Sequence, residues 1–170
     1  MTKGNWIVCE GSQRWSSALR LRLGKRDPVG KRLHRLVEVR GLAEITPWLS
    51  EQPTSLVCIE VDQANFADVL AWLPAARCDF DHARLIALAD YSLQPSPWET
   101  HREARVSWQD ADAALREAGA AMVVQSPRDL GPLENFGRRH AASVSSMQLA
   151  NDPHVPLTAK MWASLPWQAG

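Results

Sequence analysis

The sequence has no excess of charge of either sign. Nineteen lysine and arginine residues balance nineteen aspartates and glutamates, so the formal net charge at pH 7 is zero. A neutral chain has no long-range field that attracts nucleic acid or an anionic membrane surface, so we expect neither as a partner. Seven basic residues do gather between Arg20 and Arg35. We interpret them as a solvated helix end and loop, with a phosphate contact as the alternative.

Long hydrophobic runs and a cysteine framework are also missing. The first residues lead into a short apolar strand without a stretch of signal-peptide length, and no later run is long enough to cross a bilayer. The three cysteines, Cys9, Cys58 and Cys78, are an odd number and share no CxxC spacing. Cys9 and Cys58 lie in apolar strand patterns, where a reduced cysteine packs as a small hydrophobe. These features predict a cytoplasmic protein.

Sequence motifs of common enzyme classes are absent as well. Gly11 stands alone after the first apolar run, so no glycine-rich dinucleotide fingerprint is present. His101 and Glu103 have no serine elbow or second partner, which disfavours a hydrolase. The cysteine, aspartates and histidine at 78–82 match no zinc-site spacing, and we interpret them as a solvated loop between a helix and a strand.

What the sequence does contain is a regular alternation of short apolar runs and helical patterns. This alternation predicts an α/β domain whose parallel sheet has helices on both faces. The weakest strand pattern, 33–39, is expected at an edge of the sheet, and the uniformly apolar run 55–59 must be covered on both faces. We expect strands over residues 6–9, 33–39, 55–59, 84–89 and 121–124.

Helices are predicted between these strands because apolar side chains recur there at helical spacing. Gly24 should end the first helix, Pro47 should kink or shorten the second, and Pro74 should end the third. A capping box at Ser107 opens an alanine-rich fourth helix, and Asp129 caps the last one.

Two segments do not fit this alternation. Residues 90–108 are too long for a routine connection between a strand and a helix, so we expect an insertion that carries a short helix at 96–99. After residue 145 the helical pattern lapses, although apolar side chains continue. We therefore divide the chain into a domain at 1–145 and a tail at 146–170.

Two other segments resemble the receiver domain of bacterial response regulators. Residues 41–60 are similar to the second helix and third strand of a receiver. Residues 117–130 are similar to the segment in which a proline, often after a cis peptide bond, follows the fifth strand. In their order and spacing the similarities extend over residues 5–141. The resemblance implies a CheY-like, flavodoxin-like three-layer sandwich whose five-stranded parallel sheet has the order 2-1-3-4-5.

The residues with which receivers accept phosphate are replaced in this sequence. In that family an aspartate ends the third strand, two acids after the first strand hold Mg²⁺, a hydroxyl ends the fourth strand and a lysine precedes the proline. Carboxylate attack on a phosphoryl group needs the cation to offset charge repulsion. The matching positions here are Glu60, a single acid at Glu10, Ala89, and Ser126 before Pro127. The resemblance thus implies a pseudo-receiver without catalytic residues, metal or cofactor.

Two functions follow as alternatives. The first is a non-phosphorylatable signalling or scaffold module that acts through protein–protein contacts, in which Glu60 either mimics the activated state or is a tolerated polar residue at a strand end. The second is a small α/β enzyme that binds a metal or ligand at an acidic rim of Glu10, Glu60, Asp62 and Asp90.

Four tryptophans lie in the insertion, at its end and in the tail. They either fold back onto the domain or form an exposed anchor for a protein partner. The small alanine-rich fourth helix would also allow close approach of a second copy, and we expect a weak homodimer through residues 110–141. The four tryptophans are Trp98, Trp108, Trp162 and Trp167.

Overall fold

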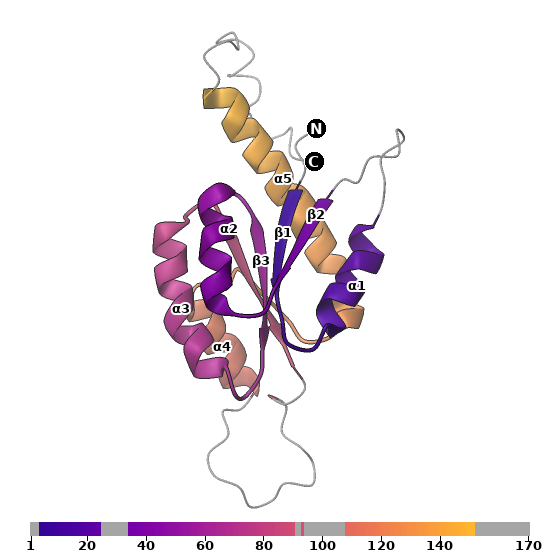
Figure 1. Cartoon of the computed structure of the whole chain (residues 1–170), viewed down its shortest axis with the longest axis vertical. Helices are drawn as coiled ribbons and strands as arrows, with labels where there is room; N and C mark the ends of the chain where they lie inside the picture. Colours follow the sequence, from indigo (N-terminus) through magenta and orange to yellow (C-terminus); the bar gives the residue numbers. More distant parts are fainter. Residues whose placement is uncertain (1–3, 25–33, 91–92, 94–107, 152–170) are drawn as a thin grey trace, which may run out of the picture.

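Five parallel strands form a single sheet in the order β2-β1-β3-β4-β5 (Figure 1). The computed structural model describes residues 4–24, 34–90, 93 and 108–151. The order confirms the flavodoxin-like topology that the sequence predicts, with the second strand at an edge. The strands are β1 (Gly4–Cys9), β2 (His34–Val39), β3 (Leu56–Val61), β4 (Arg84–Ala89) and β5 (Met122–Val124).

Helices cover both faces of the sheet and produce three layers. In Figure 1, α1 lies on one side of the sheet together with α5, and α2, α3 and α4 lie on the other side. A connection between parallel strands must cross over the sheet, which is why each helix follows a strand. The helices are α1 (Arg14–Leu23), α2 (Ile45–Glu51), α3 (Phe66–Asp79), α4 (Trp108–Ala118) and α5 (Gly131–Asn151), with short 3₁₀ turns η1 (Leu42–Glu44) and η3 (Pro127–Asp129).

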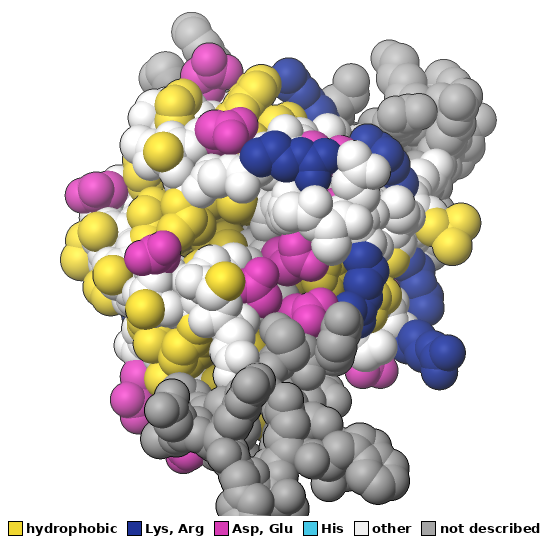
Figure 2. Space-filling model, turned by 60° about the horizontal axis from the view of Figure 1, so that its bottom comes forward, with side chains coloured by type: hydrophobic (Ala, Val, Ile, Leu, Met, Phe, Trp, Pro, Cys, Tyr) yellow, Lys and Arg dark blue, Asp and Glu magenta, His cyan; other side chains and the backbone are white. Residues whose placement is uncertain are grey.

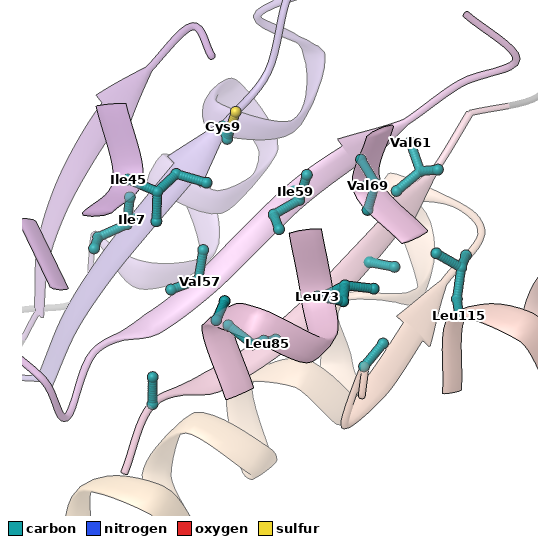
Figure 3. Close-up of a cluster of buried hydrophobic side chains, with 14 of the residues drawn as sticks. Ile7, Cys9, Ile45, Val57, Ile59, Val61, Val69, Leu73, Leu85 and Leu115 are labelled. Atoms are coloured by element: carbon teal, nitrogen blue, oxygen red, sulfur yellow. The ribbon is translucent and has the colours of Figure 1, made fainter. Parts of the chain in front are cut away.

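Each face of the sheet has its own hydrophobic core. On the side of α2, α3 and α4, Ile45, Leu73 and Leu115 pack against alternate residues of the strands (Figure 3). On the side of α1 and α5, Trp15 and Leu133 pack against the other set. All six residues of β3 are buried, because helices cover both faces of this central strand, and all of them except Glu60 are apolar.

The predicted helix ends agree with the structure at some points and differ at others. Pro74 was expected to end the third helix, but α3 continues through it to Asp79. Pro74 cannot donate to the carbonyl of Leu70, yet Leu73 and Ala76 on either side of it are buried, and this packing holds the helix together. As a result, two residues of the expected loop at 78–82 are helical.

The last helix is longer than the sequence pattern indicates. α5 has 21 residues and continues to Asn151, past residue 145, where the pattern lapses. Figure 1 shows its C-terminal end projecting beyond the beginnings of β1 and β2. The division into a domain at 1–145 and a tail at 146–170 stays a prediction.

Several expectations fall on residues outside the described part of the chain. They are the short helix at 96–99 with Trp98, most of the insertion at 90–108, and the tail residues Trp162 and Trp167. Among the helices that the structure describes, none combines the length and the apolar character needed to cross a bilayer.

Candidate functional site

The carboxyl ends of the parallel strands meet at one edge of the sheet, where open α/β folds place their sites. Glu10 follows β1 directly, Glu60 is the next-to-last residue of β3, and Ala89 ends β4. Acidic side chains gather at the centre of this surface (Figure 2). The edge therefore contains the residues that the resemblance matches to a receiver's phosphorylation site.

The carboxylate of Glu60 is bonded to the loop between β1 and α1. Its Oε2 accepts hydrogen bonds from the backbone N–H groups of Gly11 at 2.8 Å and Ser12 at 3.2 Å. Its Oε1 accepts a hydrogen bond from the Ser12 hydroxyl at 2.5 Å. The side chain is only 7% exposed, so these three donors replace the hydrogen bonds to water that a carboxylate loses on burial.

Glu10 is engaged in a different way, at the beginning of α1. Its two carboxylate oxygens accept hydrogen bonds from the backbone N–H groups of Trp15 and Ser16, each at 2.8 Å. Gln13, the residue that precedes the helix, has a left-handed backbone (φ 60°) and makes no side-chain cap. Glu10 thus satisfies N–H groups that every helix leaves unpaired, and its charge lies at the favourable end of the helix dipole.

Two arginines tie the same loop to neighbouring strands. Arg14 forms an ion pair with Asp90, just after β4, at 3.0 Å. Arg40, just after β2, donates to the backbone carbonyls of Glu10 at 3.0 Å and Gly11 at 3.2 Å. The β1–α1 loop is therefore held from β2, β3 and β4 at once.

Asp62, the fourth acid of the predicted rim, forms a turn with Asn65. Its Oδ1 accepts from the backbone N–H groups of Ala64 and Asn65, both at 2.8 Å. The Asn65 side chain in turn accepts from the Asp62 N–H at 2.9 Å and donates to the Glu60 carbonyl at 2.9 Å. Such a turn fixes the chain between β3 and α3.

Cys9 lies beside this carboxylate cluster, and its thiol is buried. Burial raises the pKa of its thiol to about 11, and the negative charges of Glu44, Glu60 and Glu10 add to the effect. Burial also raises the pKa of the Cys58 thiol. A thiol reacts as its thiolate, so both buried cysteines stay protonated and inert at neutral pH.

The remaining matched positions are Ala89, Ser126 and Pro127. Ala89 is buried and pairs in the sheet with Val61. Ser126 precedes η3, and its hydroxyl accepts from the Arg128 N–H at 3.2 Å. Pro127 follows it, and no cis peptide bond occurs among the described residues.

The structure brings together some of the predicted residues and adds others. Glu60 is bonded to Gly11 and Ser12 of the β1–α1 loop, and Glu10 is bonded to Trp15 and Ser16 at the beginning of α1. Asp62 accepts hydrogen bonds within its own turn, and Asp90 pairs with Arg14. No group of three or more acidic, histidine or cysteine residues suited to a metal ion occurs within the described ranges. Sequence reasoning missed Ser12, Arg14 and Arg40, whose partners are distant in the sequence and leave no local motif.

Trp108 is the one candidate anchor tryptophan in the described part of the chain. It begins α4, is half-buried, and packs against the core on the side of α2, α3 and α4. It therefore contributes to the fold, and a part of its surface stays accessible.

Comparisons with known proteins agree with this fold. No family model matches the sequence, and no curated protein does either. Among solved structures, the chain is similar to a CheY-like protein (TadZ) from Pseudomonas aeruginosa PAO1, with 12% identity, a TM-score of 0.54, and coverage of 82% of this chain and 94% of that one. It is also similar to a response regulator from Thermotoga maritima, with 16% identity, a TM-score of 0.59, and coverage of 82% and 98%.

These likenesses and the strand order define the class of the fold. The chain has a receiver-like domain with the CheY-like, flavodoxin-like architecture. At such low identity the likeness concerns the fold, and any function must be argued from the site.

Proposed function

We propose that this chain is a receiver-like signalling module that does not accept phosphate and acts through protein–protein contacts. The observation that carries the proposal is the position of the Glu60 carboxylate. Both of its oxygens are bonded to the β1–α1 loop, through Gly11 and Ser12. Hydrogen bonds to both oxygens stabilise the carboxylate where it is and make it a poorer nucleophile than a free one.

The surroundings of Glu60 support the same proposal. Glu10 accepts two helix N–H groups, so its oxygens are not directed toward a cation that would screen an incoming phosphoryl group. Ser126 has no positive charge to bind the transferred oxygens, and Ala89 has no hydroxyl. Phosphoryl transfer depends on positioning and charge stabilisation, and none of these side chains supplies either.

Protein contact is then the mode of action that the fold leaves open. The predicted homodimer through residues 110–141 is one form of it. α4 and α5 lie in opposite layers and flank β5, so this segment forms one edge of the molecule. Trp98, Trp162 and Trp167 are further candidates for partner contacts, and their positions lie outside the described residues.

The experiment is incubation with acetyl phosphate and Mg²⁺, followed by intact-mass measurement. We expect no added phosphoryl group on the wild-type chain. A phosphorylatable receiver, treated in parallel, controls for the reagent. The variant Glu60→Asp should also stay unmodified, because Ser126 and Glu10 still provide neither lysine nor metal site. A stoichiometric gain of one phosphoryl group on the wild-type chain would refute the proposal.

A further inference from the structure

The two helical layers carry opposite charge. The layer of α1, η3 and α5 contains six arginines and two acidic residues. The layer of η1, α2, α3 and α4 contains seven acidic residues and two arginines. The protein is neutral as a whole, yet its two outer faces have opposite sign.

The basic layer also exposes an apolar side chain. Leu21 of α1 is 86% exposed, the most exposed large hydrophobic residue of the described chain, and it lies between Arg20 and Arg22 in the sequence. Figure 2 shows basic side chains and a protruding hydrophobic side chain on the side of α1. Arg22 and Arg139 are exposed and form no ion pair with any residue that the structure describes.

The acidic layer offers a surface of matching chemistry. Phe66, Leu70 and Trp72 of α3 are only partly buried against the core below them. The two helices on either side of α3 each carry an exposed acid in their last turn, Glu51 in α2 and Glu117 in α4. Figure 2 shows hydrophobic and acidic side chains side by side on the side of α2, α3 and α4.

We propose that these faces bind each other between two copies of the chain, with the Leu21 face of one copy on the α2–α4 face of the next. Leu21 contacts the apolar side chains of α3, and the arginines of α1 and α5 meet the acids of α2 and α4. Apolar contact at the centre with charge pairs at the rim is the usual arrangement of a protein interface. A second copy of the chain is the partner that fits, because every copy has both the basic face and the complementary acidic face.

The geometry of this contact has a consequence for assembly. The two surfaces are different, so the contact is head-to-tail and each added copy presents a new free face. The assembly therefore grows with protein concentration instead of stopping at two copies. Its charge pairs are exposed, which makes the association weak and sensitive to salt. This inference is independent of whether Glu60 accepts phosphate.

Sedimentation analysis of the full chain tests the proposal. At about 0.5 mM protein and about 50 mM NaCl, we expect a weight-average mass at least about 1.5-fold above that of the monomer, falling to the monomer at about 500 mM NaCl. Leu21→Ser should lower the association. The pair Glu51→Lys and Glu117→Lys should abolish it, and both lysines lie at helix C-termini, where a cation is favourable for folding.

Charge complementation separates this contact from other modes. The pair Arg22→Glu and Arg139→Glu should also abolish self-association, and mixing it with the Glu51→Lys, Glu117→Lys chain should restore binding between the two variants. Circular dichroism and the melting temperature check that each variant is folded. A symmetric dimer whose association is unchanged by salt and by the four charge substitutions would overturn the proposal. A wild-type chain that stays monomeric while its basic face binds anionic lipid vesicles would overturn it as well.

Discussion

Glu60 connects the third strand to the loop that precedes the first helix. Its carboxylate is 7% exposed and accepts hydrogen bonds from two backbone N–H groups and one hydroxyl. These bonds hold the β1–α1 loop on β3, so Glu60 contributes to the stability of the fold. The sequence identifies Glu60, Glu10, Ala89 and Ser126 as departures from a phosphorylation site. It could not show where the carboxylates point, because their partners depend on how the β1–α1 loop turns at Gln13.

Removing this acceptor should destabilise the fold. Glu60→Ala leaves the N–H groups of Gly11 and Ser12 without their partner, and we expect a loss of about 2 kcal/mol in the free energy of unfolding. Glu60→Gln keeps an oxygen acceptor and should cost about half as much. Urea denaturation measures both, with the exposed Glu51→Gln as control, expected within about 0.5 kcal/mol of wild type. Equal stability of Glu60→Ala and wild type would contradict the structural role.

His140 makes stability depend on pH. It lies within α5, and its Nε2 is 2.8 Å from the Thr54 carbonyl, which can only accept, so Nε2 carries the proton. Burial lowers the pKa of His140 and that of His34. Because these pKa values are lowered in the folded state, the histidines of the unfolded chain bind protons at a higher pH than those of the folded chain. Their neutral forms therefore contribute fully to the free energy of unfolding above about pH 6.5. This contribution is lost as the pH falls through the lowered pKa values.

We expect the free energy of unfolding to decrease between pH 7.5 and 5.5, by at most about 1.4 kcal/mol per pH unit for each histidine. His140→Gln keeps a donor for the Thr54 carbonyl but does not titrate, so its profile should be flatter. Denaturation at a series of pH values measures the slope. A variant with the full wild-type slope would exclude His140 as a source of the pH dependence.

At the scale of helices and strands, most of the fold could be predicted from the sequence. The central runs formed strands because the inside of a parallel sheet covered on both faces needs apolar strands, and the mixed run at 33–39 formed the edge strand β2. Two helix ends were misjudged, at Pro74 and beyond residue 145. At Pro74 the local signal marks where the helix is weak, whereas the packing of Leu73 and Ala76 lets α3 continue.

The contact between α5 and β1 depends on a glycine. A Cβ added at Gly137 would lie 2.4 Å from Cζ2 of Trp6, which is 1% exposed and cannot move aside easily. We expect Gly137→Ala to cost about 2 kcal/mol, measured as a lower melting temperature. Gly131→Ala, in the first turn of the same helix with no atom within 4 Å of the added Cβ, is the control and should be neutral or slightly stabilising. Equal melting temperatures for the two variants would contradict the tight packing of α5 on β1.

At the scale of the whole molecule, a neutral composition conceals two oppositely charged faces. The nineteen acids and nineteen basic residues balance in the sequence, and only the assignment of α1 and α5 to one layer and of α2, α3 and α4 to the other separates them. From the composition alone we expected no strong binding to polyanions, but the composition could not reveal this asymmetry. The carboxyl ends of the strands and the β1–α1 loop lie at the edge of the sheet, between the basic and the acidic helical layers.

The state of the β1–α1 loop during exposure to Mg²⁺ and acetyl phosphate tests the central claim most directly. The backbone amides of Gly11 and Ser12 report on it, because both donate to Glu60. In two-dimensional ¹H–¹⁵N NMR spectra we predict that their chemical shifts stay unchanged on adding the cation and the phosphodonor, and change in Glu60→Gln. A shift of these two amides in the wild-type chain that appears only with Mg²⁺ and acetyl phosphate together would show that Glu60 leaves the loop to accept phosphate, and would contradict the account.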